Sequence, residues 1–202
     1  MRVLRAFAIL PVLLWGTAAA PAPKTLQLSA ADAAGRIFIG DPGAKAGTGT
    51  NGAQHVAGIR PAGDDDAGTQ PVYAANGIGL GISLEKWRGA RGAVEVESSG
   101  MHDRLTFHFA NLIAFGTYSL FYADLTNLSP QTPIEALDGT GTSNTFTVGE
   151  TGMATLTLTT PRPMGKNGAL VLVYHSDGKA HGLSPGTVSI DAHEQIIAPL
   201  ST

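Results

Sequence analysis

The stretch LTFHFANLIAFGTYSLFY, residues 105–122, decides the fold class of this chain. Apolar side chains occupy every second position at both of its ends: Leu105, Phe107 and Phe109, then Tyr118, Leu120 and Tyr122. Side chains of a strand point alternately to its two faces, so a period of two predicts a strand with one buried face. The stretch therefore predicts two successive β-strands.

Further strands are predicted on both sides of this stretch. The same alternation, or a short apolar run, is present at 26–28, 36–39, 78–84, 94–97 and 154–159. Residues 146–159 indicate a hairpin that turns at Gly149–Gly152, and Leu170–Tyr174, which is apolar on both faces, indicates a central strand. A last strand is expected at Val188–Ile197. Short strands between Gly, Pro and Asp turns predict an all-β chain folded as an antiparallel β-sandwich.

One local motif adds detail to this architecture. Leu112 stands six residues before Tyr118, and Gly116 and Thr117 lie between them. These seven residues resemble the tyrosine corner of immunoglobulin-like and fibronectin-type sandwiches, although Ala114 stands where a proline is often found. The resemblance implies a Greek-key sandwich in which the Tyr118 hydroxyl bonds back to the upstream backbone. An ordinary aromatic residue at the start of a strand is the alternative interpretation.

The chain is predicted to have three parts: a signal peptide at 1–20, a Gly/Ala-rich N-terminal segment at 21–76 and the β-sandwich core at 77–202. Arg2 and Arg5 precede an apolar run, and a row of alanines then forms a cleavage site. The cut is expected between residues 19 and 22, because Pro21 disfavours cleavage directly before it. The protein is then expected to be periplasmic or secreted. No second apolar run of membrane length follows, so no membrane span is predicted after cleavage.

The segment from Gly40 to about Gln70 is dense in glycine, alanine and aspartate, and this composition predicts a long loop near the N-terminus. An acidic triplet within it, Asp64–Asp66, has the charge to bind calcium. The alternating spacing and the distal glutamate of an EF-hand loop are absent, so the triplet indicates a solvated loop instead.

Composition excludes several kinds of chemistry. The 202 residues contain no cysteine, which rules out disulfides, thiol catalysis, iron–sulfur clusters and zinc–thiolate sites. The formal net charge of −3 provides no basic surface of the kind that nucleic acid requires. Histidine and carboxylate side chains remain as candidate metal ligands.

One apparent catalytic motif is rejected. Gly182–Gly186, with the letters GLSPG, matches the G-x-S-x-G nucleophile elbow, and Asp191 and His193 follow in the order of a hydrolase triad. The elbow requires a helix after the serine and a backbone N–H on the next residue. A strand pattern follows here, and Pro185 has no N–H. The sequence therefore does not indicate a serine hydrolase.

A candidate metal site follows the predicted central strand. The segment HSDGKAHG, residues 175–182, brings together His175, Asp177 and His181. Neutral imidazole and carboxylate suit Zn(II), Cu(II) or Ni(II). A polar turn is the alternative, since Ser-Asp-Gly is an ordinary turn sequence. His193 is not expected to join the site, because a hairpin strand starting at Val188 would place it roughly 16 Å from His175, at ~3.3 Å per residue.

Two functions remain open at this point. The first, which the sequence favours, is a non-enzymatic binding or structural module of the cell envelope or the extracellular space, because no strong catalytic constellation opposes it. The second is a His-rich metal-binding protein or metalloenzyme that holds copper, zinc or nickel in the 175–181 loop. Stoichiometric metal in the folded protein separates the two. The sequence identifies no partner.

Overall fold

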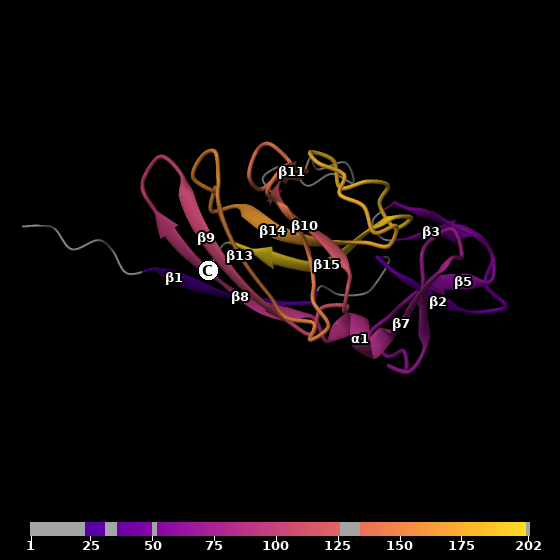
Figure 1. The fold of residues 1–202 in the computed structure, drawn as a ribbon. Coiled ribbons are helices and arrows are strands. Elements are labelled where there is room, and N and C mark those ends of the chain that lie inside the picture. The colour runs from indigo at the N-terminus through magenta and orange to yellow at the C-terminus, as the bar shows by residue number, and fades with distance from the viewer. Residues whose placement is uncertain (1–22, 31–35, 50–51, 126–133, 201–202) are drawn as a thin grey trace, which may run out of the picture.

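Two antiparallel β-sheets face each other in a β-sandwich, and a group of short strands lies at one end of it (Figure 1). The computed structural model describes residues 23–30, 36–49, 52–125 and 134–200. The predicted signal peptide at 1–20 lies outside the described residues. The predicted all-β, antiparallel sandwich is confirmed.

The first sheet, called sheet A, has the strand order β1-β8-β9-β13. Its strands are β1 (Lys24–Ser29), β8 (Arg91–Ser98), β9 (Asp103–Ala110) and β13 (Ala154–Thr159). The second sheet, sheet B, has the order β11-β10-β14-β15, and β12 also pairs with β10. Its strands are β10 (Thr117–Asp124), β11 (Ile134–Ala136), β12 (Thr145–Thr147), β14 (Gly168–His175) and β15 (Ala192–Pro199). The sandwich therefore includes β1, which precedes the Gly/Asp-rich segment in the chain.

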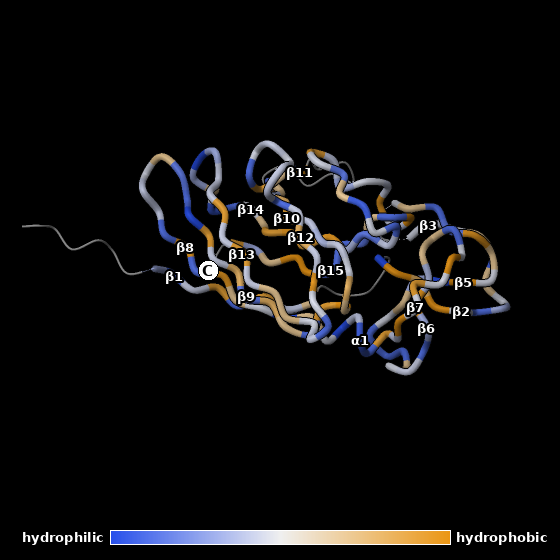
Figure 2. The backbone as a smooth tube through the Cα atoms, viewed as in Figure 1, coloured by the Kyte–Doolittle hydropathy of each residue, from blue (hydrophilic) through white to orange (hydrophobic). Residues whose placement is uncertain are grey.

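A stack of aromatic rings connects the two sheets. Phe107 and Phe109 of β9 lie 5.5 Å apart between ring centroids, and Phe109 stacks on Phe146 of β12 at 5.8 Å. Tyr118 of β10 continues the stack at 5.8 Å from Phe146. The alternating aromatic positions of residues 105–122 thus build the core, as Figure 2 shows by the hydrophobic colour of the facing strands.

The prediction of a central strand at Leu170–Tyr174 is confirmed, because β14 lies between β10 and β15 and all its residues are buried. Its inner side chains join the sandwich core. Its outer side chains, such as Val171 and Val173, form a second apolar cluster with Phe121 of β10 and Ala136 of β11. The outer face of sheet B is therefore covered near β14.

Short strands between β1 and β8 form a small module of their own. They are β2 (Phe38–Gly40), β3 (Gly47–Thr48), β4 (Gln54–His55), β5 (Ile59–Pro61), β6 (Pro71–Tyr73) and β7 (Gly79–Ser83). Strands β5-β2-β6-β7 make one sheet, and β3 pairs with β4. Helix α1 (Leu84–Arg88) follows, capped by the Ser83 hydroxyl, which accepts a hydrogen bond from the Lys86 N–H. The segment predicted as a long loop thus contains three strands of two or three residues each.

Two strand predictions need correction. Residues 146–159 do not form a hairpin, because β12 pairs with β10 in sheet B and β13 pairs with β9 in sheet A. The turn between them crosses from one sheet to the other. The last strand begins at Ala192 instead of Val188, since residues 187–191 form a tight turn in which the Thr187 N–H bonds to Asp191 Oδ1 at 2.6 Å.

The hydrogen bond that the tyrosine corner implies is present. The Tyr118 hydroxyl accepts a hydrogen bond from the Ile113 N–H at 2.9 Å and donates one to Gln195 Oε1 at 3.0 Å. Burial raises the pKa of Tyr118, so the hydroxyl keeps its proton. The interpretation of Tyr118 as an ordinary aromatic residue is therefore wrong, whereas the Greek-key connection stays a prediction.

Candidate metal centre

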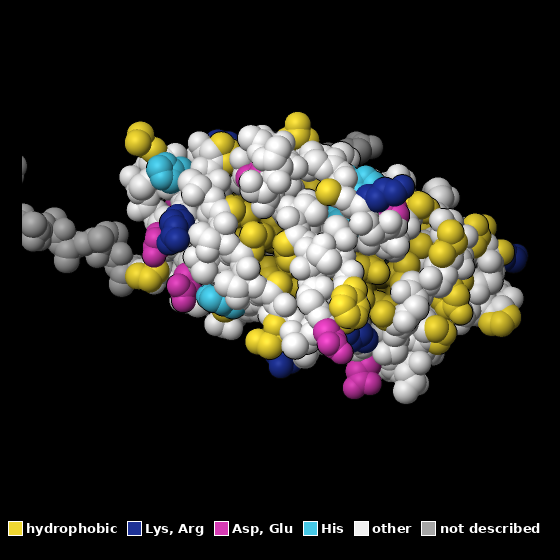
Figure 3. Space-filling model, viewed as in Figure 1, with side chains coloured by type: hydrophobic (Ala, Val, Ile, Leu, Met, Phe, Trp, Pro, Cys, Tyr) yellow, Lys and Arg dark blue, Asp and Glu magenta, His cyan; other side chains and the backbone are white. Residues whose placement is uncertain are grey.

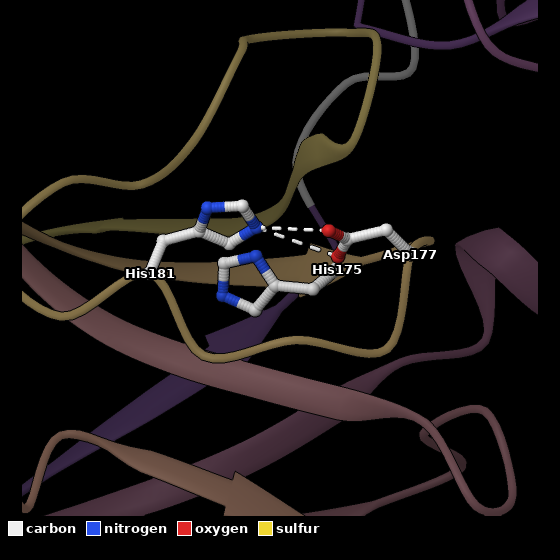
Figure 4. Close-up of side chains that lie close together, drawn as sticks. All are labelled: His175, Asp177 and His181. Atoms are coloured by element: carbon white, nitrogen blue, oxygen red, sulfur yellow. Dashed lines mark hydrogen bonds and ion pairs between the residues drawn. The ribbon is translucent and has the colours of Figure 1, made fainter.

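Three predicted ligands converge on the outer face of sheet B, where β14 ends. His175 is the last residue of β14, and Asp177 and His181 lie in the loop that follows. One ligand atom from each of the three lies within 4.8 Å of the other two. Figure 4 shows the two imidazole rings beside each other and the Asp177 carboxylate facing the nitrogen of His181. The structure therefore brings the three candidate ligands together, and metal binding by them stays a prediction.

His175 is the buried member of the group, with about 1% of its surface exposed. Its Nε2 lies 2.7 Å from the Ser119 hydroxyl, whereas its Nδ1 is buried without a hydrogen-bond partner among the described residues. In Figure 4 one ring nitrogen of His175 faces the nitrogen of His181 that contacts Asp177. Since Nε2 is occupied by Ser119, the facing nitrogen is the unpartnered Nδ1.

Asp177 and His181 form the partly exposed side of the group. His181 Nε2 lies 3.3 Å from Asp177 Oδ2, and the side chains are 23% and 27% exposed. Burial acts to raise the pKa of Asp177, but hydrogen bonds from the Lys179 N–H and from His181 outweigh it, and the pKa lies below its usual range. Asp177 therefore provides an ionised carboxylate beside two imidazoles.

Burial and the nearby His181 lower the pKa of His175 to about 4, although Asp177 and Asp191 act in the opposite direction. The ring is thus neutral at physiological pH. A neutral imidazole keeps a lone pair on one nitrogen, which is the form that binds a metal ion.

Backbone contacts hold the ligand loop against the sheet. The Gly178 carbonyl accepts a hydrogen bond from the Thr117 hydroxyl, and Gly178 itself adopts a left-handed φ of 71°. The loop also touches residues 139–143 so closely that a Cβ atom on Gly141 would lie 2.3 Å from the carbonyl carbon of Gly182. Only glycine at position 141 permits this approach, which packs the neighbouring loop directly against the residue that follows His181.

The neighbouring loop 139–143 is ordered by Asp138. Its carboxylate accepts hydrogen bonds from the backbone N–H groups of residues 140–143. Burial acts to raise the pKa of Asp138, yet these bonds lower it to about 2. An ionised carboxylate therefore holds the loop that packs against Gly182 of the ligand loop.

Sequence reasoning misses the residues behind His175. Ser119 of β10, Thr145 of β12 and Asn144 lie next to one another, with 2.7 Å between the Ser119 and Thr145 hydroxyl oxygens. Ser119 and Asn144 are buried. In the sequence, a serine between apolar residues of a strand gives the signal of an ordinary solvent-facing position, so nothing marks it as a partner of His175.

The structure also corrects the expected distance of His193. It pairs with Tyr174, one position from His175, because β15 starts four residues later than predicted. His193 still does not join the site. Tyr174 and His175 are adjacent on β14 and face opposite sides of the sheet. His193 faces the same side as its partner Tyr174, and its ring points into the core, 6.3 Å from Trp87 and 6.1 Å from Tyr174.

Other polar candidates have local roles. Ser184 accepts a hydrogen bond from the Gly186 N–H within a turn, and no helix follows it. Asp66 of the acidic triplet pairs with Arg60 at 2.5 Å and accepts a hydrogen bond from the Gly63 N–H. These contacts lower the pKa of Asp66 to about 2, the Arg60 hydrogen bond being the largest cause. Asp66 is thus committed to an ion pair.

The donor set suits a borderline metal ion. Metal–nitrogen and metal–oxygen bonds of about 2.0–2.2 Å around a tetrahedral ion place the ligand atoms roughly 3.3–3.6 Å apart. The distance from His181 to Asp177 already matches this spacing. Since all the ligand atoms lie within 4.8 Å of one another, the widest pair needs to approach by about 1.5 Å at most. Three protein ligands leave at least one coordination position for solvent.

No known protein family, curated protein or solved structure matches this chain. Within the described residues, no helix has the length and apolar character needed to cross a membrane. On the face drawn in Figure 3, charged side chains are few, and both signs are scattered.

Proposed function

We propose that the protein is an exported, non-enzymatic β-sandwich that binds one Cu(II), Zn(II) or Ni(II) ion through His175, Asp177 and His181. The observation that carries the proposal is the buried Nδ1 of His175, which has no hydrogen-bond partner in the described part of the chain and faces the other two ligands. An unpaired buried polar atom is costly and requires an explanation, and at His175 the approach of two further ligand atoms provides one.

The surroundings of the site support the same conclusion. The site lies at the rigid end of a buried strand, and its two other ligands are partly open to solvent, which gives an ion access. One carboxylate and two imidazole ligands match a divalent ion of intermediate softness better than calcium or magnesium, which prefer oxygen ligands.

Export is the second part of the proposal and rests on the N-terminal sequence. A basic start, an apolar run and small residues are the features of a cleaved signal peptide. The intact mass of protein recovered from its native compartment tests this part. The expected mass lacks about twenty N-terminal residues, and retention of Met1 contradicts export.

Titration calorimetry of the purified mature protein with zinc, nickel and copper salts tests the metal site. The expected result is one ion per chain with a Kd well below about 1 mM. His181→Ala and Asp177→Asn should each weaken binding, and both positions are open enough for the fold to persist. Because the metal binds the folded state, adding metal should also raise the melting temperature.

His108→Ala is the matched control, because His108 is exposed on the outer face of sheet A and contacts Thr155. His55 is a poorer control, since it is buried against Phe38. Equal binding by the wild type, His181→Ala and Asp177→Asn overturns the proposal, as does the absence of saturable binding.

A further inference from the structure

We infer that Asn144, Thr145 and Ser119 form a one-directional hydrogen-bond chain that holds His175 in its Nε2–H tautomer and presents Nδ1 to the metal. The three residues are positioning residues, because they act through His175 and none of them is a proposed ligand. The metal part of this inference rests on the proposed function, whereas the tautomer is a property of the metal-free protein.

Strand register places the first link of the chain. His175 lies opposite Thr117 in the β10–β14 pair, and Ser119 lies opposite Val173. Ser119 and His175 are therefore diagonal neighbours on the outer face of sheet B, where diagonal side chains come within reach of each other. The Ser119 hydroxyl oxygen lies 2.7 Å from His175 Nε2. This contact is short and almost fully buried.

The far end of the chain determines its direction. Asn144 donates a hydrogen bond from its amide nitrogen to the Leu120 carbonyl oxygen at 3.2 Å. A carbonyl oxygen only accepts, so the orientation of the Asn144 amide is determined. Its Oδ1 then faces the Thr145 hydroxyl at 3.4 Å and also only accepts. The Thr145 hydroxyl is therefore the donor in its contact with Asn144.

The remaining links follow from this one. Because Thr145 has used its proton, its oxygen accepts a hydrogen bond from the Ser119 hydroxyl, 2.7 Å away. Ser119 has then used its own proton and can only accept at His175. The Nε2 of His175 carries the hydrogen and donates it. A neutral imidazole has one N–H, so Nδ1 carries the lone pair.

The alternative tautomer would block the site. A hydrogen on Nδ1 would point into the space shared with Asp177 and His181, where an ion needs a lone pair. Partners of a ligand's second nitrogen commonly determine its tautomer and orientation, and losing them typically weakens metal affinity about 10- to 100-fold. Ser119 and Thr145 have this relation to His175.

Nitrogen-15 NMR of the histidine rings in the metal-free protein tests the tautomer directly. His175 should be observed as the Nε2–H form in the wild type and as a mixture in Ser119→Ala. Thr145→Val should also give a mixture, because Ser119 is then free to donate to Nε2, whereas Thr145→Ser keeps a hydroxyl and should restore the wild-type signals. A Nδ1–H form in the wild type overturns the inference, even if metal binds.

Zinc affinity provides the second measurement. Ser119→Ala should weaken binding about 10- to 100-fold, Thr145→Val by less, and Thr145→Ser hardly at all. Thr157→Val is the control, because the side-chain hydrogen bond described for Thr157 is with Thr106, on the exposed face of sheet A. If the wild type binds none of zinc, copper and nickel but shows the Nε2–H form with the variant pattern stated for the tautomer, the proposed function fails and the tautomer inference stands. Unchanged tautomers in both Ser119→Ala and Thr145→Val overturn it.

Discussion

The paired strands β14 and β15 each have one buried histidine. The two histidines are offset by one position in the pairing, and they point to opposite faces of sheet B. His175 points to the outer face of sheet B, where a carboxylate and a second imidazole approach it. His193 points to the inner face, where its ring meets the edges and faces of Trp87 and Tyr174. Burial lowers the pKa of each to about 4.

The difference shows that burial of a histidine does not by itself indicate a metal site. Both Nδ1 atoms lack a hydrogen-bond partner among the described residues. At His175 the free nitrogen faces two further donors, whereas His193 is surrounded by aromatic rings and bonds through Nε2 to the Ser176 hydroxyl at 3.0 Å. The convergence of several ligand atoms separates a binding site from a core histidine.

The largest expected effect concerns metal affinity. His175→Gln should weaken zinc binding by more than roughly 100-fold, because losing a metal ligand lowers the affinity more than losing a residue that positions a ligand. His193→Gln should leave the affinity within about threefold, since its ring faces the opposite side of the sheet. Titration calorimetry on the two variants measures the contrast. A similar loss in both variants would show that the two faces are not independent.

The second effect concerns stability and pH in the metal-free protein. A folded-state pKa of about 4 against the ordinary 6.5 means that the unfolded chain takes up a proton at His193 between these values while the folded chain does not. The free energy of unfolding should therefore fall as pH drops from 6.5 to 4, by about 3 kcal/mol for this residue, and stay level outside that window.

Urea unfolding at pH 7.5 and pH 4.5 measures this difference. Carboxylates and His175 also contribute to the total, so the comparison is between the wild type and His193→Gln. The pH-dependent loss should be smaller in the variant by about 2.5 kcal/mol, because pH 4.5 lies just inside the lower end of the window. An identical loss in both proteins would falsify the assignment of a neutral, buried His193.

The smallest effect concerns the polar contacts of the inner face. Tyr118→Phe removes the partner of both the Ile113 N–H and Gln195 Oε1, and it should lower the free energy of unfolding by about 1–3 kcal/mol. Tyr122→Phe is the matched control, because the Tyr122 hydroxyl makes a long contact of 3.5 Å with the Gly165 carbonyl. Thermal or urea unfolding of both variants provides the test, and equal losses contradict the role of the corner. Metal affinity should not change in either.

Much of the fold was predictable because it depends on local patterns. The alternation of Leu105, Phe107 and Phe109 predicts β9, and the unbroken apolar run predicts the central strand β14. The pairing of β12 and β13 was not predictable from the pattern of 146–159, because a turn between two strands looks the same whether they share a sheet or cross between sheets. Phe146 of β12 stacks on Tyr118 of its own sheet and on Phe109 of the facing sheet, and these contacts exist only in the assembled sandwich.

The sequence by itself determined that this is an all-β chain without thiol chemistry, and that His175, Asp177 and His181 form one candidate site. Those conclusions need only the composition, the two-residue period of the apolar side chains and the short spacing between the three candidate ligands. Tertiary structure alone decided that His193 faces away from the site and that Ser119 and Asn144 stand behind His175. The reason is physical: a one-position change of register reverses the face of every side chain. Partners that are 56 residues apart, such as Ser119 and His175, meet only when the sheet is assembled.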